Sequence, residues 1–129
     1  MDKEGSVVCV VDDDESVCRG LGRLLKSGGF RVEAYASASD FLDSVRREVC
    51  ACLVVDVRMP GMDGLELQSR LASSGCEVPI IFMTAHDDKQ AEREALTLGA
   101  VAFLYKPFDG DVLLAAVRAG LEAGTRGRT

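Results

Sequence analysis

The chain of 129 residues is 47% hydrophobic and 28% charged, which is typical of one globular domain that buries its own core. With 15 basic and 21 acidic residues, its net charge is −6 at pH 7. Such a surface repels phosphate backbones, so we expect no direct nucleic-acid binding by these residues. No apolar run approaches the roughly 20 residues of a membrane span, and residues 1–6 lack the apolar core of a signal peptide. We therefore predict a cytoplasmic location without membrane attachment.

Strand-like apolar runs recur along the chain and alternate with stretches of helical spacing. The predicted strands, in chain order, are residues 7–11, 30–36, 53–55, 79–84 and 102–105. A helix is predicted after each strand, because apolar residues recur there at positions that share one helix face. The inward residues of the five helices are Val17, Leu21, Leu24 and Leu25; Phe41, Leu42 and Val45, after Ser39; Leu65, Leu67 and Leu71; Ala91, Ala95 and Leu98; and Leu113, Ala116, Val117 and Leu121.

Glycines mark several of the expected helix ends. Gly28, Gly75 and Gly99 stand where the first, third and fourth helices are expected to stop, and Asp111 opens the fifth. The resulting division of the chain is a domain over residues 6–122, an N-terminal tail over residues 1–5, and a flexible tail or linker stub over residues 123–129.

Five alternations of strand and helix predict an α/β fold, with a single five-stranded parallel sheet and helices on both of its faces. Residues 7–11, 53–55 and 79–84 are continuously apolar, as central parallel strands are. Residues 30–36 carry Arg31 and Glu33 in alternation with apolar residues, and this pattern favours an edge strand.

Five cysteines without a secretory signal argue against a disulfide framework. Cys50 and Cys52 do not form the Cys-x-x-Cys pair of a zinc knuckle, and the lone His86 is distant from them in sequence. A structural zinc is therefore not expected. Cys9 lies inside an apolar run and is predicted to be a small buried hydrophobic residue.

Polar side chains follow four of the five predicted strands at their carboxyl ends, the edge where open parallel sheets bind ligands. They are Asp12, Asp13, Asp14 and Glu15 after the first strand, Asp56 after the third, Thr84 and His86 at the fourth, and Lys106 after the fifth. Carboxylates that converge on one crevice repel one another, and a hard cation such as Mg²⁺ relieves that repulsion. Lys106 adds a second positive charge, which is suited to a phosphoryl group.

Some of these acids have a simpler interpretation as helix caps. Asp14 and Glu15 stand at the start of the first predicted helix, and Asp63 precedes the third, so we assign all three to capping and first-turn charge. For Asp56, at the mouth of an apolar strand, a turn cap is the alternative. Its polar neighbours favour a reactive carboxylate held beside a metal ion.

The motifs resemble the receiver domain of two-component response regulators, over residues 6–122. The resemblance rests on Asp12-Asp13, Asp56, Thr84-Ala85 and Lys106-Pro107, and the stretches DVRMPGMDG and AFLYKPF look most like the FixJ-type subgroup. It implies a flavodoxin-like (βα)5 fold with strand order 2-1-3-4-5. It also implies a domain that is phosphorylated by a sensor histidine kinase and controls an output, transcription in the FixJ type, without turning over a separate substrate.

The resemblance implies roles for individual residues. Asp56 is the expected phosphoacceptor, a carboxylate nucleophile. Mg²⁺, for which Mn²⁺ can substitute, is expected on Asp13, on Asp56, on the backbone carbonyl of Arg58 and, through water, on Asp12.

Three further residues are expected to bind the phosphoryl group or to change position in response to it. Lys106, joined to its proline by a cis bond, pairs with the phosphoryl oxygens, Thr84 moves to hydrogen-bond them, and Phe103 is the aromatic switch residue. Arg58 and His86 stand two residues after Asp56 and Thr84 respectively, so we expect them to tune how long the phosphoryl group survives.

Alternation along residues 102–105 places Phe103 and Tyr105 on one face of the last strand and Leu104 on the other. The aromatic face is expected to lie between the fourth and fifth helices. We expect phosphorylation to remodel the surface around Tyr105 and to favour a homodimer.

An enzyme on a similar scaffold is the alternative function, namely a Mg²⁺-dependent phosphatase that forms an aspartyl phosphate. Haloacid-dehalogenase-type phosphatases usually follow their nucleophile with Asp-x-[Asp/Thr] and carry a cap insertion. Here Val57 and Arg58 follow Asp56, and no insertion interrupts the pattern. A flavodoxin would need a Ser/Thr-rich phosphate loop after the first strand, where this chain carries four acids.

Overall fold

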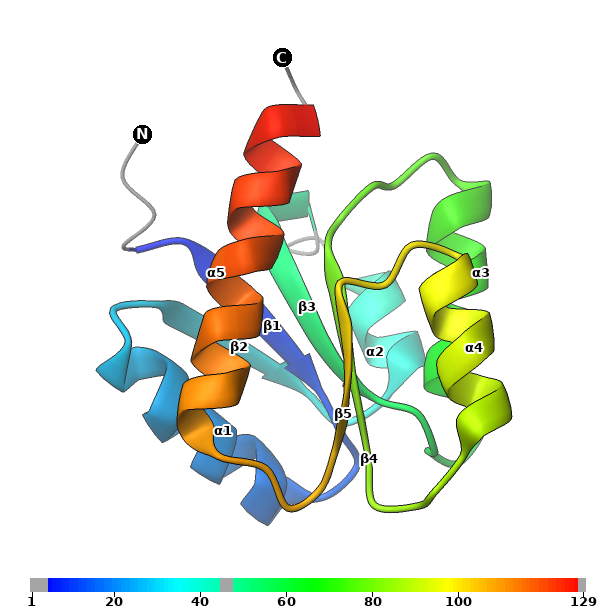
Figure 1. Cartoon of the computed structure of the whole chain (residues 1–129), viewed down its shortest axis with the longest axis horizontal. Helices are drawn as coiled ribbons and strands as arrows, with labels where there is room; N and C mark the ends of the chain where they lie inside the picture. Colours follow the sequence, from blue (N-terminus) through cyan, green and yellow to red (C-terminus); the bar gives the residue numbers. More distant parts are fainter. Residues whose placement is uncertain (1–4, 45–47, 128–129) are drawn as a thin grey trace.

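The computed structural model describes residues 5–44 and 48–127, and within them five strands alternate with five helices (Figure 1). The strands are β1 (Val7–Val11), β2 (Arg31–Tyr35), β3 (Cys50–Asp56), β4 (Ile80–Thr84) and β5 (Ala102–Tyr105). The helices are α1 (Glu15–Ser27), α2 (Ala38–Asp43), α3 (Gly64–Ser73), α4 (Lys89–Thr97) and α5 (Gly110–Gly127). No helix in this part of the chain is both long and apolar enough to span a membrane.

All five strands are parallel, in the order β2-β1-β3-β4-β5. This confirms the predicted sheet, with the more polar β2 at one edge and the fully buried β1 and β4 inside it. Helices α1 and α5 cover one face of the sheet, and α2, α3 and α4 cover the other (Figure 1). Because parallel strands end at the same edge, this topology brings the residues after β1, β3, β4 and β5 together.

Two apolar cores follow from the alternation of side chains along each strand. Phe41, Leu67 and Phe82 belong to the core under α2, α3 and α4, while Leu25 and Leu113 belong to the core under α1 and α5. The predicted inward residues lie in or against these cores, with the exception of Leu98 and of Val45, which is outside the described residues. Cys9 is fully buried, as predicted.

Leu98 is 54% exposed, so its predicted inward orientation is wrong. The cause is local: α4 ends at Thr97, Leu98 is its C-cap, and Gly99 takes a φ of +99° as the chain turns away. The helix therefore stops before Leu98 reaches the core. The predicted ends of the other helices at Gly28 and Gly75 are confirmed.

Two element boundaries differ from the predicted ones. β3 begins at Cys50 rather than Leu53, since Cys50 and Cys52 pair with β1 although their small side chains gave no strong strand signal. α5 continues through Gly127, so residues 123–127, which we expected in the C-terminal tail, are helical. The stretch contains no proline to interrupt the helix that precedes it. Residues 1–4 and 128–129 lie outside the described part of the chain.

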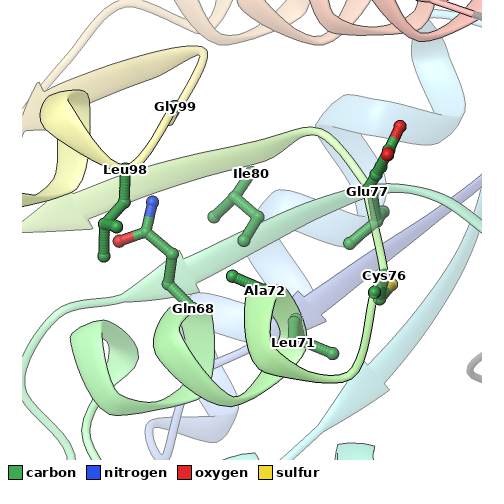
Figure 2. Close-up of a pocket in the computed structure, with 10 residues that line it drawn as sticks. Gln68, Leu71, Ala72, Cys76, Glu77, Ile80, Leu98 and Gly99 are labelled. Carbon is green, nitrogen blue, oxygen red and sulfur yellow. The ribbon is translucent and has the colours of Figure 1, made fainter.

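One buried polar side chain, Gln68 of α3, joins two helices at the end of the sheet away from the predicted site. Its Nε2 donates to the Ala95 carbonyl of α4 at 3.0 Å, and its Oε1 has no hydrogen-bond partner among the described residues. Gln68, Leu98 and Ile80, the first residue of β4, line a cavity of about 340 Å³ (Figure 2). The sequence pattern of α3 did not predict this link.

A close approach at Gly64 yields the first prediction. A Cβ on Gly64 would lie 2.5 Å from the Asp56 carbonyl oxygen and 3.1 Å from Phe82 Cε1, so Gly64→Ala should lower the free energy of unfolding by about 1–3 kcal/mol. Gly20, in α1, is the matched control, because nothing lies within 4 Å of a Cβ placed there. Gly20→Ala should raise stability by about 0.5–1 kcal/mol. Urea unfolding measures both, and a Gly64→Ala midpoint equal to that of the parent would contradict the close approach.

Candidate functional site

Four strands deliver polar side chains to the edge that lies at the bottom of Figure 1. Asp12 follows β1, Asp56 is the last residue of β3, Thr84 is the last residue of β4, and Lys106 follows β5. Because β1, β3, β4 and β5 are consecutive in the sheet, all four strand ends lie side by side. Each of these residues ends a strand or directly follows one, so the sheet fixes where each side chain begins.

Asp12, Asp13 and Asp56 form a compact carboxylate cluster, as predicted. One oxygen of each carboxylate lies within 4.8 Å of the others. Asp12 is only 2% exposed and Asp56 is partly buried, whereas Asp13 is exposed. The cluster therefore reaches from the interior to the solvent.

Lys106 supplies the positive charge of the cluster. Its Nζ lies 3.3 Å from Asp12 Oδ2 and 3.8 Å from Asp56 Oδ2. Its backbone N–H donates to the Thr84 carbonyl at 2.7 Å, and its bond to Pro107 is cis, as expected. Because a carboxylate as buried as Asp12 needs a paired charge, this contact ties β5 to β1 across the end of the sheet.

The electrostatics of Asp56 reflect its surroundings. Burial raises the pKa of Asp56 above its ordinary value, and the neighbouring Asp12 and Asp13 raise it further, while Lys106 acts in the opposite direction. The charged form of Asp56 is therefore costly in the metal-free fold. A cation bound at the cluster would remove this cost.

The donor set of the cluster fits Mg²⁺. The three carboxylates offer only oxygen atoms, which hard cations prefer, and Mg²⁺ usually keeps several waters and takes one or two carboxylates. Arg58 lies beside the cluster, with its backbone N–H donating to Asp56 Oδ1 at 3.4 Å. The role of its carbonyl as a ligand stays a prediction.

The other acids near the site cap helices, as predicted. Asp14 caps α1 and accepts hydrogen bonds from Ser16, which lower the pKa of Asp14. Glu15 lies in the first turn of the same helix. Asp63 caps α3 and accepts from the Glu66 backbone N–H at 2.8 Å. None of the three belongs to the carboxylate cluster.

One residue in the segment after β4, Asp88, was not predicted from the sequence. Thr84 is fully buried, and its hydroxyl accepts from the backbone N–H of His86 at 3.1 Å. Asp88, which caps α4, forms an ion pair with Arg58 at 2.8 Å. The only signal in the sequence was the pair of acids that opens the charged helix after Thr84.

The aromatic residues of β5 face α4. Phe103 packs between Phe82, at 6.0 Å between ring centroids, and Tyr105, at 5.3 Å, while Leu104 belongs to the core on the opposite face. β5 does lie between α4 and α5, but the expectation that its aromatic face lies between these helices needs correction. The side-chain alternation turns that face entirely toward α4.

Tyr105 is fixed by charged residues of α4. Its hydroxyl donates to Glu92 at 2.6 Å, and the Lys89 ammonium lies 4.8 Å from its ring centroid. The hydrogen bond to Glu92, together with burial, raises the pKa of Tyr105 to about 12. Tyr105 is thus a neutral, oriented phenol on a charged surface.

Comparison with known proteins agrees with this geometry. The family described as "Response regulator receiver domain" matches residues 8–118. The chain belongs to this family. The receiver domain is 43% identical over 129 residues to the response regulator protein TodT of Pseudomonas putida, covering all of this chain and 57% of TodT.

Two further relatives support the assignment. The transcriptional regulatory protein FixJ of Azorhizobium caulinodans is 46% identical over 118 residues, which cover 92% of this chain and 56% of FixJ. The crystal structure of FixJ-N superposes with a TM-score of 0.83 at 35% identity, over 95% of this chain and 96% of that one. The receiver domain thus spans little more than half the length of the curated relatives. Since these relatives are response regulators, the phosphatase alternative is not favoured.

The strained cluster yields the second prediction. Asp56→Asn should raise the free energy of unfolding of the metal-free domain at pH 7 by on the order of 1 kcal/mol, because it removes a partly desolvated charge. The gain should be absent below about pH 3.8, the ordinary pKa, where the carboxyl is protonated in both states. It should grow as the pH rises through the raised pKa of Asp56.

Urea unfolding at about pH 3 and pH 7 measures this effect, with Asp14→Asn as the control that keeps a helix cap. Mg²⁺ should stabilise the parent more than Asp56→Asn. Equal stability of parent and variant at pH 7 without metal would show that Asp56 carries no electrostatic cost.

Proposed function

We propose that this receiver domain accepts a phosphoryl group on Asp56 from a partner histidine kinase. A carboxylate oxygen of Asp56 attacks the phosphorus, the bond to the donor's histidine nitrogen breaks, and an acyl phosphate forms. The observation that supports this most directly is the position of Asp56: it is partly desolvated at a strand end, with Lys106 Nζ at 3.8 Å and two further carboxylates beside it.

The residues of the site would have different roles in this reaction. Mg²⁺ would be held by Asp13, by Asp56, by the Arg58 carbonyl and, through water, by Asp12. When bound, the ion neutralises charge on the transferring phosphoryl group. Lys106, which donates to Asp12, would pair with a phosphoryl oxygen. Thr84 would give up its bond to the His86 N–H and donate its hydroxyl to the phosphoryl group.

Phosphorylation then controls an output, and the surface of Tyr105 and α4 is the candidate. Movement of Thr84 toward the phosphoryl group would leave room beneath it for Phe103, and a turn of Phe103 would disturb the ring beside it, Tyr105. One of the relatives named above, FixJ, is a transcriptional regulatory protein. We infer the same kind of output for this protein.

The third prediction tests the phosphoacceptor. With acetyl phosphate and Mg²⁺, intact-mass spectrometry should show one added phosphoryl group on the parent and on Asp14→Asn, and none on Asp56→Asn. Excess chelator should abolish the labelling, because the carboxylate cluster then keeps its repulsion. Undiminished labelling of Asp56→Asn would refute the assignment, and continuous release of phosphate at high turnover would favour a phosphatase.

The fourth prediction concerns self-association. Beryllofluoride, which mimics the phosphoryl group, should convert the domain from monomer to dimer, as measured by light scattering. Tyr105→Ala should weaken the dimer about tenfold, since aromatic residues are frequent binding hot spots. Tyr35→Ala is the control, because Tyr35 lies on β2 at the opposite edge of the sheet. A domain that stays monomeric with beryllofluoride would exclude this output.

A further inference from the structure

An ion pair joins the loop after Asp56 to the beginning of α4. Arg58 Nη2 donates to Asp88 Oδ2 at 2.8 Å, although the two residues are 30 positions apart in sequence. The other oxygen of the same carboxylate, Oδ1, accepts from the Ala91 backbone N–H at 3.0 Å and caps α4. One carboxylate therefore holds both the guanidinium and the start of the helix.

The pair contributes little to the stability of the fold. The two side chains are 56% and 23% exposed, and exposed ion pairs of this kind are typically worth at most about 1 kcal/mol. An interaction this weak is easily exchanged for a stronger one. Its importance thus depends on what else Arg58 can bind.

A phosphoryl group on Asp56 would be a stronger partner for Arg58 than Asp88 is. The Arg58 backbone nitrogen lies 3.4 Å from Asp56 Oδ1, so the side chain starts beside the phosphoacceptor. A phosphoryl group brings about −1.5 to −2 charges and three acceptor oxygens, and the planar guanidinium can bind two of them at once.

The helix at the other end of the pair is weakly packed. The buried residues of α4 are two alanines, Ala91 and Ala95, so the helix gains little from apolar burial. The segment that leads into it, residues 85–88, is held at its start by the bond from the His86 N–H to Thr84 and at its end by the bond from Arg58 to Asp88. Polar contacts thus set the position of the start of α4.

We propose that Asp88 competes with the phosphoryl group on Asp56 for the Arg58 guanidinium. Phosphorylation exchanges the Arg58–Asp88 pair for an Arg58–phosphoryl pair and frees the start of α4 from the loop after β3. This inference rests on the proposed function of Asp56. Asp88 is a positioning residue, because it sets how often Arg58 is available to the phosphoryl group without touching that group itself.

The exchange has a kinetic consequence. Hydrolysis requires a water oxygen to bond to phosphorus while the bond to the Asp56 oxygen breaks. Arg58 on the phosphoryl group occupies part of the space from which water approaches, and so lengthens the lifetime of the acyl phosphate. Asp88 withdraws Arg58 and shortens that lifetime.

Asp88→Asn tests the exchange, because asparagine caps a helix as well as aspartate does but carries no charge. After labelling with acetyl phosphate and removal of the donor, Asp88→Asn should dephosphorylate about two- to fivefold more slowly than the parent, the range expected for the loss of one exposed ion pair. In an Arg58→Ala background the same substitution should leave the rate unchanged. Asp87→Asn is the matched control: it makes the same charge change one residue earlier, at a side chain 82% exposed that lies near Lys89.

A second measurement follows Arg58 directly. In ¹⁵N NMR spectra, beryllofluoride should shift the Arg58 guanidinium signal of the parent, and Asp88→Asn should already show part of that shift without beryllofluoride. The exchange would be overturned if Asp88→Asn slowed dephosphorylation equally in the Arg58→Ala background. It would also be overturned if Asp87→Asn slowed dephosphorylation as much as Asp88→Asn does. A parent that takes up no phosphoryl group on Asp56 would refute the proposed function as well, whereas a labelled parent without coupling between the two positions refutes the exchange alone.

Discussion

The contact between Lys106 and two carboxylates is the constraint around which the site is arranged. Asp12 is almost completely buried, and a buried charge without a partner would cost several kcal/mol. Its partner comes from β5, which is separated from β1 by both β3 and β4. The lysine side chain therefore reaches across the ends of β4 and β3. The strand order places these residues at one edge of the sheet, and the ion pair links the two outermost of the four strand ends that form the site.

The charges in this cluster are not balanced. Lys106 brings one positive charge to a group of three carboxylates, so the charged form of Asp56 stays unfavourable, as its raised pKa indicates. A cluster satisfied by a second lysine would be more stable but would leave no need for a metal ion or a phosphoryl group. Local conflict of this kind is what functional sites are expected to show.

The sequence predicted those features that repeat or that sit at strand ends. Strand and helix alternation gave the sheet, and the residues after the strands gave Asp12, Asp56, Thr84 and Lys106, because parallel topology brings such positions together whatever their separation in the chain. The resemblance to receiver domains supplied their roles. The placement of Leu98 failed because helical spacing cannot say at which residue a helix stops, and α4 stops one residue earlier.

Gln68 and Asp88 were not predictable, for a different reason. Each acts through a polar contact to another element, 27 residues away for Gln68 and 30 for Asp88. Gln68 is a polar residue on the buried face of α3, and Asp88 stands at the end of a loop, so neither contact leaves an apolar periodic pattern in the sequence. Such contacts depend on how two loops or helices happen to be placed once the cores have formed. A capping residue such as Asp88 also looks the same in sequence whether or not its second oxygen has a partner.

These two contacts lie at opposite ends of the same helix. Gln68 holds the α4 carbonyl of Ala95, near the end of the helix, and Asp88 links its start to Arg58. By contrast, α5 buries Leu113, Val117 and Leu121 and is anchored by apolar packing along its length. Apolar packing cannot be exchanged for another partner, whereas a hydrogen bond or an ion pair can. If the start of α4 is released while Gln68 keeps the other end, the helix pivots rather than detaches. Such a pivot would change the hydrogen bond from the Tyr105 hydroxyl to Glu92 in the first turn of α4, while the Tyr105 backbone stays in β5.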